Sequence, residues 1–568
     1  MPHYLVSWND PNERLLDIAI TFDAPSDAPR LMLPAWRPGR YLIQNYAANV
    51  RDWSATDASD VSRSMRKDGL TSWRVDARAG ERITVRYRFY AGLLDAGSSF
   101  LDEREAYFNG TNLFMLVEGL REEPHGLTIA APADWRIETQ VPRIDEGSFE
   151  ARNYDHLVDS PVIAAPAMTR HTFNEAESMI HLVFVGDEGI DTEQFVEPVR
   201  ALVRTQAELF GGLPTREYRF LFHVADKWHG VEHEDSCSIV LRRDALLGAG
   251  PGSFGWDRTL SISSHELFHV WNVKRIVPAR FHPYDYWNAT PTRLLWVMEG
   301  MTSYFGELSM VRSGVWTVER YVEHLRTEIE TLENSPARKH LSVAQASFDG
   351  WLASPAHMHD QPNAFFSFYN KGEIVALMLD LTIRQRTGGA KSLDDVVRFL
   401  WNEYGATGRG LEEDGFERAV ATIADVGDFF ARFVEGTDPL PYGLLATAGL
   451  EFSASPRNPE SISLGLRLRS EPGSLVVESA IRGGAGMKAG LLPGDEIVAV
   501  DGSRTATEAA LNVALRGVAR DSSFEIVVSR GGLLRSLTAV AEADPGTSVQ
   551  LRISAESGLR KQWLRRDE

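Results

Sequence analysis

The sequence has one cysteine, no long apolar run and no signal-peptide pattern. Because Cys237 is the only cysteine in 568 residues, no disulfide can form within the chain, and nothing requires an oxidising compartment. No apolar run reaches the roughly 18 residues of a membrane-spanning helix. The first residues lack a basic segment followed by an apolar one. We therefore expect a cytoplasmic protein, or a periplasmic or secreted one if a signal peptide preceded this sequence.

Positive charge is also scarce. The chain has 59 Lys and Arg against 79 Asp and Glu, so its formal net charge is −20. No basic run occurs before the short segment 560–566, and nucleic-acid binding needs clustered Lys and Arg. With 43% hydrophobic and 24% charged residues, the composition is that of a globular protein. Its length predicts about three to four domains.

Alternation of apolar and polar residues marks the first region, residues 1–168. Leu16–Phe22 and Ile83–Phe89 alternate with the period of half-buried strands, and turn-forming residues separate such runs. A β-sandwich domain is predicted here, and this region gives little functional signal. In residues 169–450, strand patterns are followed by helical ones, which predicts an α+β catalytic domain.

Within the catalytic region, several boundaries can be expected from local residues. Strands are predicted at Ile180–Val185 and Tyr218–Val224, with a helix between them that ends at Gly211-Gly212. Thr290, followed by a proline, predicts the N-cap of a later helix. A further helix is expected to end at Gly388-Gly389.

The third region, residues 451–545, is β-rich and resembles bacterial-type PDZ domains. The resemblance rests on Ala489–Asp495 followed by Asp501-Gly502, and it places a carboxylate-binding loop at Leu464–Leu466. Such domains bind a peptide C-terminus or an extended strand by β-augmentation. A PDZ-shaped spacer without a peptide ligand remains the alternative. Residues 546–568 are expected to form a C-terminal tail.

The pentapeptide His265-Glu266-Leu267-Phe268-His269 carries most of the chemical information. An H-E-x-x-H sequence on a helix puts two imidazoles one turn apart on one face, where both can bind a single Zn²⁺. Glu266 lies about 100° round the helix from His265, so it can reach a zinc-bound water without binding the metal. The sequence therefore predicts one catalytic zinc ion with His265 and His269 as ligands and Glu266 as general base.

Glu299 is the candidate for the third protein ligand that a catalytic zinc site usually has. It lies in Trp296–Tyr304, an otherwise apolar run on the helix expected after Thr290. The alternative is an exposed glutamate paired with a basic residue. Its apolar neighbours argue against this alternative, because an unpaired buried carboxylate is costly.

These motifs, together with Tyr369-Asn370-Lys371-Gly372, resemble the gluzincin aminopeptidases. The resemblance implies that Tyr369 stabilises the tetrahedral intermediate, for which a phenol is a suitable neutral donor. Gly230-Val231-Glu232-His233 resembles the edge-strand motif with which these enzymes hold the free α-amine of a substrate. It implies substrate-binding roles for Gly230 and Glu232. The alternatives are a core tyrosine at the start of a helix and a solvated loop glutamate.

Three features narrow the resemblance to the glycyl aminopeptidase family. The 29 residues between His269 and Glu299 exceed the spacing of aminopeptidase N-like enzymes, Met298 replaces their usual asparagine, and a PDZ-like region is foreign to them. The glycyl aminopeptidases combine an N-terminal β-domain, a thermolysin-like catalytic domain and a PDZ domain. Leu33–Tyr41 resembles their N-terminal signature, and the likeness spans essentially the whole chain.

The expected function is a zinc metalloprotease, an aminopeptidase that hydrolyses small N-terminal residues, Gly and Ala by resemblance, from peptides with a free N-terminus. Two alternatives stay open, a zinc endopeptidase with substrates presented by the PDZ-like region and an inactive PDZ scaffold. A preference for small residues needs a blocked pocket, for which the nearby candidates are Phe365, Phe366 and Phe368. Four other histidines have no second metal-pair spacing and are expected to line the cleft or face solvent: His229, His233, His357 and His359.

Overall fold

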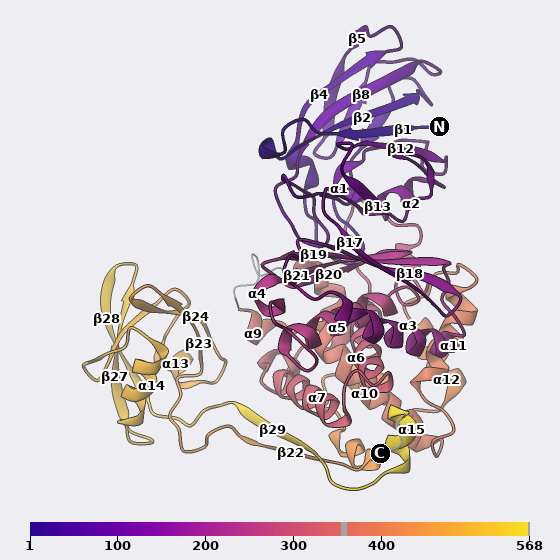
Figure 1. Ribbon diagram of the computed structural model, residues 1–568. Helices are drawn as coiled ribbons and strands as arrows, with labels where there is room; N and C mark the ends of the chain where they lie inside the picture. Colours follow the sequence, from indigo (N-terminus) through magenta and orange to yellow (C-terminus); the bar gives the residue numbers. More distant parts are fainter. Residues whose placement is uncertain (354–359, 566–568) are drawn as a thin grey trace. The chain divides into compact units, whose positions relative to one another are not determined.

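The computed structural model describes residues 1–353 and 360–565, so His357 and His359 lie outside the described residues. It confirms the expected fold class, a mixed α+β chain with a β-rich N-terminal region, a helical catalytic region and a β-rich PDZ region (Figure 1). Contacts between residues group the chain into two compact units. The first comprises residues 1–292, 302–317 and 394–423, and the second comprises residues 293–301, 318–393 and 424–568.

An eight-stranded sheet opens the first unit, with the order β14-β15-β12-β1-β2-β8-β4-β5. The alternation predicted in the sequence pairs Leu16 on β2 with Phe89 on β8, and both side chains enter a buried apolar core. The strands of this sheet are β1 (His3–Ser7), β2 (Leu15–Asp23), β4 (Val50–Asp57), β5 (Ser62–Arg63), β8 (Arg82–Tyr90), β12 (His125–Ala130), β14 (Arg143–Asp145) and β15 (Ser148–Ala151).

Two four-stranded sheets share that core, with the orders β13-β16-β10-β9 and β11-β3-β7-β6. The first contains β9 (Phe100–Leu101), β10 (Ala106–Phe108), β13 (Arg136–Thr139) and β16 (Val162–Ala165). The second contains β3 (Arg30–Met32), β6 (Met65–Gly69), β7 (Ser72–Val75) and β11 (Leu116–Val117). The short helices α1 (Gly110–Leu113) and α2 (Tyr154–Val158) complete the region.

A five-stranded sheet with the order β17-β18-β19-β21-β20 begins the catalytic region. Its strands are β17 (Thr169–Glu175), β18 (Ser178–Val185), β19 (Glu217–Ala225), β20 (His229–Glu232) and β21 (Ser236–Arg242). Helix α3 (Val196–Phe210) ends at Gly211 with φ +86°, as the glycine pair predicts. Strand β20 is the edge strand and pairs antiparallel with β21, with Glu232 opposite Cys237.

Helix α5 (Phe254–Phe268) packs closely against α6 (Met301–Arg312). Ser253 caps the start of α5, because its side chain accepts a hydrogen bond from the Trp256 amide. A β-carbon at Gly306 would lie 3.2 Å from the α-carbon of His265, and the Ser264 hydroxyl donates to the Gly306 carbonyl at 2.7 Å. The glycine therefore permits α6 to approach the face of α5 that carries His265.

The helix expected to begin at Thr290 begins later, so that prediction was wrong. Its first turn is a π-helical turn, η5 (Trp296–Gly300), which continues into α6. The residues between Thr290 and η5 make tertiary hydrogen bonds instead of a helical turn. Thr292 donates to Glu413 at 2.7 Å, and the Pro291 carbonyl accepts from Arg280 at 3.1 Å. These tertiary contacts outweigh the local capping preference.

In the second unit, η5 crosses helix α10 (Phe368–Arg386) at a pair of glycines. A β-carbon at Gly300 would lie 2.5 Å from the α-carbon of Gly372, so the two backbones touch. Helix α10 is followed by Gly388 and Gly389, as expected from the sequence. The other helices of the catalytic region are α4 (Arg243–Leu246), α7 (Val318–Glu333), α8 (Val343–Phe348), α9 (Gln361–Ala364), α11 (Leu393–Leu400) and α12 (Gly415–Ile423).

The PDZ region forms a sheet with the order β23-β24-β25-β27-β28, to which β26 is added beside β25. A cavity of about 560 Å³ is lined by residues of strand β23 and helix α14, Leu466 and Leu511 among them. The elements are β23 (Leu466–Glu471), β24 (Ser474–Ala480), α13 (Ala485–Ala489), β25 (Glu496–Val500), β26 (Ser503–Arg504), α14 (Glu508–Arg516), β27 (Ser523–Arg530) and β28 (Leu533–Val540).

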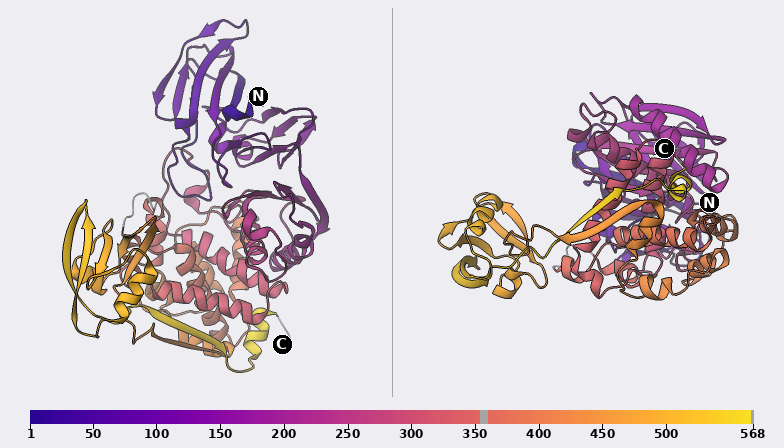
Figure 2. Two further views of the ribbon diagram at one scale, coloured as in Figure 1. Left: turned by 60° about the vertical axis from the view of Figure 1, so that its left-hand side comes forward. Right: turned by 90° about the horizontal axis from the view of Figure 1, so that it is seen from below.

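Two antiparallel strands flank the PDZ region in the sequence, β22 (Leu450–Pro456) before it and β29 (Thr547–Ile553) after it. Figure 2 shows this pair side by side from two directions. The chain then forms α15 (Gly558–Leu564), which buries Trp563 completely. Among the described residues, no helix combines the length and apolar composition needed to cross a bilayer.

Candidate functional site

Two histidine rings converge at the C-terminal end of α5. The Nε2 atoms of His265 and His269 lie 3.0 Å apart. Two nitrogens at about 2.0–2.1 Å from one tetrahedral ion would be about 3.3 Å apart. The pair therefore fits a shared metal ion, as the H-E-x-x-H spacing predicts.

The opposite nitrogen of each ring has a partner. His269 Nδ1 lies 2.8 Å from the Asn272 carbonyl, and His265 Nδ1 lies 3.4 Å from the Ser303 hydroxyl. A carbonyl can only accept, so Nδ1 of His269 carries the proton and its Nε2 carries the lone pair that can bind a metal. Such contacts orient metal-binding histidines and select the tautomer that can bind.

Glu299 is a further residue that could hold this metal ion. It lies in the π-helical turn η5 and is almost fully buried. The sequence predicts it as the third ligand beside His265 and His269. Two imidazoles and one carboxylate are a donor set typical of catalytic zinc, and π-helical turns occur often at functional sites.

A second group of possible ligand atoms within 4.8 Å of one another comes from Glu232, Glu266 and His269, all buried. Strand β20 contributes Glu232, and helix α5 contributes the other two. The structure thus brings Glu232, singled out in the sequence by its motif, next to the H-E-x-x-H segment. Two carboxylates in one buried place need positively charged partners, and a metal ion and a substrate ammonium are both suitable.

Gly230 contacts the Glu266 side chain. A β-carbon at position 230 would lie 2.1 Å from Glu266 Oε1 and 2.9 Å from a methyl carbon of Ile262. Only glycine leaves room for the carboxylate in this position. The geometry gives Gly230 a second role beside the predicted one, because it makes space for the predicted general base.

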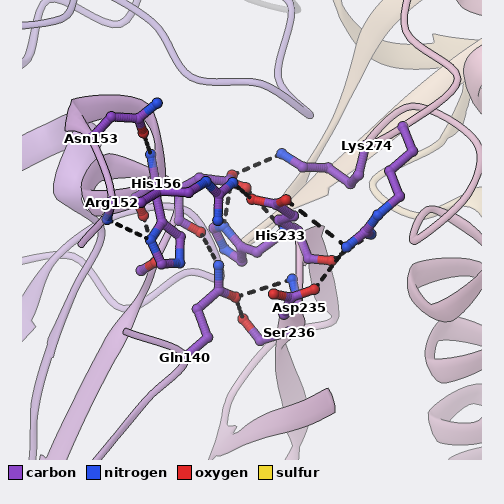
Figure 3. A network of polar contacts seen from close by, with 12 residues as sticks. Gln140, Arg152, Asn153, His156, His233, Asp235, Ser236 and Lys274 are labelled. Carbon is purple, nitrogen blue, oxygen red and sulfur yellow. Dashed lines mark hydrogen bonds and ion pairs between the residues drawn. The ribbon is translucent and has the colours of Figure 1, made fainter. Parts of the chain in front are cut away.

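The residues directly after strand β20 form hydrogen bonds in a buried polar network (Figure 3). Asp159 accepts hydrogen bonds from Lys274 Nζ at 2.8 Å, from His233 Nδ1 at 3.3 Å and from the Glu234 amide at 2.9 Å. Burial alone would raise the pKa of Asp159, but the charge of Lys274 and the His233 ring lower it well below the usual range. Asp159 therefore stays ionised near neutral pH.

The same network continues to the β20–β21 turn. Gln140 accepts from the Ser236 hydroxyl at 2.6 Å, and Arg275 donates to Asp235 at 2.8 Å. Lys274 and Arg275 lie five and six residues after His269, whereas Gln140 and Asp159 come from the N-terminal region. This contact pattern joins the edge strand, the segment after α5 and the N-terminal region.

Tyr369 lies in the first turn of α10, after the N-cap residue Ser367. Its ring stacks on Phe368 with centroids 5.0 Å apart. Gly372, which follows in the same motif, touches Gly300 at the helix crossing, and Gly300 is the neighbour of Glu299. The glycine of the Tyr-x-Lys-Gly motif therefore lets the backbone that carries Tyr369 approach the turn that carries Glu299.

The three phenylalanines before Tyr369 differ in burial. Phe366 and Phe368 are buried and Phe365 is half-buried. Lys371 Nζ lies over the Phe366 ring at 4.8 Å, and burial lowers the pKa of Lys371 to about 8, with a contribution from Arg338.

Cys237 is chemically inert here. Its side chain is completely buried, and burial followed by the charge of Glu266 raises the pKa of the thiol well above its usual value. A thiol nucleophile needs a lowered pKa, so the structure argues against a cysteine protease.

Three contact residues could not be found as site residues from the sequence. Asp159 and Lys274 are single charged residues without a motif, and Gly39 lies in the Leu33–Tyr41 signature, whose function the sequence does not indicate. The α-carbon of Gly39 faces Glu232, since a β-carbon there would lie 2.4 Å from Glu232 Oε2.

Comparison with known proteins places these features in a family. Residues 3–166 match the Peptidase M61 N-terminal domain, residues 258–375 match M61 glycyl aminopeptidase, and residues 476–530 match a PDZ domain. The chain belongs to the M61 glycyl aminopeptidase family. As a member it is a zinc aminopeptidase, a peptide-bond hydrolase with a PDZ domain, and zinc is its cofactor.

One solved structure is similar over essentially the whole chain. An aminopeptidase N family protein from Idiomarina loihiensis is 27% identical, with a TM-score of 0.93 over 99% of this chain and 100% of that chain. An M1 zinc metallopeptidase from Deinococcus radiodurans is 14% identical, with a TM-score of 0.47 over 78% of this chain and 95% of that chain. No curated protein matches the chain.

Proposed function

We propose that this M61 aminopeptidase removes small N-terminal residues, Gly and Ala, from peptides with a free amine. One zinc ion would be held by His265, His269 and Glu299. The observation that carries the proposal is the group Glu232, Glu266 and His269, whose ligand atoms lie within 4.8 Å of one another. It puts a possible general base and a possible amine partner beside the same histidine.

Glu266 takes the proton of the attacking water in this proposal. A bound zinc ion supplies Lewis-acid chemistry, since it lowers the pKa of a coordinated water to about 7 and polarises a carbonyl. The Glu266 carboxylate is buried and rests against Gly230, which limits its movement. A base held in one position needs little reorganisation during proton transfer.

Glu232 binds the substrate ammonium. Its side chain is almost fully buried, and its Oε1 has no hydrogen-bond partner within the described part of the chain. An ammonium would satisfy this atom and would fix which peptide bond reaches the metal. Tyr369 donates its phenolic hydroxyl to the oxyanion that develops during attack.

The preference for Gly is supported by the family model, which is described as a glycyl aminopeptidase, and Ala is included as the next smallest residue. Phe366 and Phe368, buried before Tyr369, are the candidates for blocking a deeper side-chain pocket. We also propose domain boundaries near residues 168, 450 and 545. The cavity lined by β23 and α14 would take a peptide C-terminus or an extended strand.

Substrate hydrolysis tests the proposal. Gly-, Ala-, Leu- and Phe-anilides are compared with the N-acetylated Gly- and Ala-anilides, each with and without a chelator. The proposal predicts chelator-sensitive cleavage of Gly- and Ala-anilide, weak cleavage of the bulky anilides and none of the acetylated forms. Equal cleavage of capped substrates would indicate an endopeptidase, and equal cleavage of bulky residues would remove the small-residue preference.

A further inference from the structure

A turn of the N-terminal region contacts the carboxylate that we assign to amine binding. At Gly39, φ is +77°, and a β-carbon there would lie 2.4 Å from Oε2 and 2.8 Å from Oε1 of Glu232. No side chain fits at those distances. Both carboxylate oxygens therefore rest against the α-carbon of Gly39, and an ammonium can approach only from the remaining directions.

The turn is held by its own contacts and by a second loop. The Arg40 amide donates to the Arg37 carbonyl at 3.3 Å, and Arg37 Nη1 donates to the Pro38 carbonyl at 3.0 Å. The buried Arg37 guanidinium lies against Gly97, where a β-carbon would come within 1.9 Å of Nε. The turn and the loop around Gly97 therefore fit together closely.

The second loop also holds strand β20. The Ala96 amide donates to His229 Nδ1 at 3.1 Å, and His229 is the first residue of the strand that ends with Glu232. Burial and the charge of Arg37 lower the pKa of His229 to about 4, against the opposing effect of Asp95. At neutral pH the ring is therefore uncharged and can accept this hydrogen bond.

At the other end of the strand, Asp159 holds His233 and the Glu234 amide. Three segments of the N-terminal region therefore contact β20 or the residues directly after it. Gly39 lies at Glu232, Ala96 at His229, and Asp159 at His233 and Glu234. An edge strand has neighbours on only one side within its sheet, so its position depends on contacts of this kind. All these residues belong to the first compact unit.

We propose that Gly39 is a positioning residue for the amine-binding carboxylate, so that the N-terminal region supplies one wall of the amine end of the site. This inference rests on the proposed function of Glu232. A side chain at position 39 would push the carboxylate away from its place, and the ammonium would lose a charge-assisted hydrogen bond of good geometry. The three atoms nearest to a β-carbon at position 39 all belong to Glu232, so the added side chain would act first on this carboxylate.

Two inhibitors separate amine binding from metal binding. Glycine hydroxamate and N-acetylglycine hydroxamate both bind a metal through the hydroxamate, but only the first has an ammonium. The ratio of their inhibition constants therefore measures the interaction with Glu232. In the zinc-loaded wild-type enzyme we expect the free-amine form to inhibit at least about tenfold better, as expected for a hydrogen bond between charged groups.

The variants are Gly39→Ala and the matched control Gly80→Ala. Gly80 lies in the same N-terminal region with φ +83°, but a β-carbon there would meet nothing within 4 Å. Both substitutions carry the same backbone strain, and only the first conflicts with Glu232. We expect the inhibition ratio to fall about tenfold in Gly39→Ala and to stay unchanged in Gly80→Ala, with inhibition by the acetylated form unchanged in both.

An unchanged ratio in Gly39→Ala, with the wild-type preference present, would overturn the inference. Absence of any amine preference in the wild-type enzyme would instead overturn the proposed role of Glu232. If Gly39→Ala does not fold, the same substitution is made together with Glu232→Ala, which removes the conflicting atoms. Recovery of folded protein supports the contact, and failure to recover contradicts it.

Discussion

Helix α5 and strand β20 each bring a carboxylate to His269, but they hold it by different means. On α5, Glu266 and the histidines are positioned by the helical repeat itself, and Ser253 caps the helix. On β20, a four-residue edge strand, Glu232 is positioned by contacts with residues far away in the sequence. The proposed metal-binding face is therefore fixed by local structure, whereas the proposed amine-binding end depends on tertiary packing.

The difference between α5 and β20 predicts which property of the enzyme a single substitution should change. Changes on α5 should alter the chemical step, since the helix fixes the reacting groups. Changes around β20 should alter substrate binding and stability, since the strand depends on its neighbours. Four substitutions test this division, in order of decreasing expected effect.

Glu266→Gln should have the largest effect. The amide cannot accept the proton, so kcat for Gly-anilide should fall about 10²–10⁴-fold while the zinc content stays the same. Asp257→Asn changes a carboxylate in the first turn of the same helix and should leave kcat within about twofold. Wild-type kcat in a zinc-loaded Glu266→Gln enzyme would remove Glu266 from proton transfer.

Asp159→Asn should destabilise the protein strongly. The substitution leaves the buried Lys274 ammonium without its carboxylate at 2.8 Å, and breaking such a buried pair costs about 3–5 kcal/mol. Asp155→Asn is the control, because its partly exposed pair with Arg121 should contribute only about 0–1 kcal/mol. The free energy of unfolding is measured by urea titration, and equal losses in the two variants would contradict the buried role of Asp159.

Glu232→Gln should weaken substrate binding more than turnover. Loss of a charge-assisted hydrogen bond to the substrate ammonium should raise KM for Gly-anilide about 10–100-fold, with a smaller change in kcat. Glu234→Gln changes a partly exposed carboxylate two residues later, which pairs with Arg152, and should leave KM within about twofold. An unchanged KM in Glu232→Gln would exclude this carboxylate from amine binding.

His229→Gln should have the smallest effect of the four. It should change the free energy of unfolding only at acidic pH. Because the pKa of His229 falls from 6.5 to about 4 on folding, the unfolded chain binds a proton in this window that the folded chain does not. The corresponding stability is fully present above pH 6.5 and is lost as the pH falls to 4. Between pH 4 and pH 6.5, the free energy of unfolding of His229→Gln should depend less steeply on pH than that of the wild type, by the amount that corresponds to about one bound proton. An unchanged slope would contradict the lowered pKa.

The same division explains what could be predicted from the sequence. His265, Glu266 and His269 lie in one pentapeptide whose helical spacing predicts their geometry, and strands β2 and β8 follow from their alternating residues. The start of the Glu299 helix could not be predicted, because Thr292 and Pro291 are held by Glu413 and Arg280 from other parts of the chain. Local capping signals do not include such partners.

The contacts of Glu232 show this limit most clearly. Its motif lies on β20, but Gly39 contacts Glu232 from about 190 residues earlier in the chain, and Asp159 contacts the following residues, His233 and Glu234, from about 70 residues earlier. Nothing in their local sequence indicates this partner, so the N-terminal region gave little functional signal. The place of this region beside Glu232, the proposed amine-binding residue, follows only from the tertiary structure.

Metal analysis of the purified protein tests the central claim most directly. Elemental analysis by mass spectrometry is applied to the wild-type enzyme, Glu266→Gln and His269→Ala after dialysis against metal-free buffer. We predict about one zinc per chain in the first two proteins and a loss of at least about tenfold in His269→Ala. Wild-type protein without zinc, or His269→Ala protein that retains it, would contradict the metal site on which the account rests.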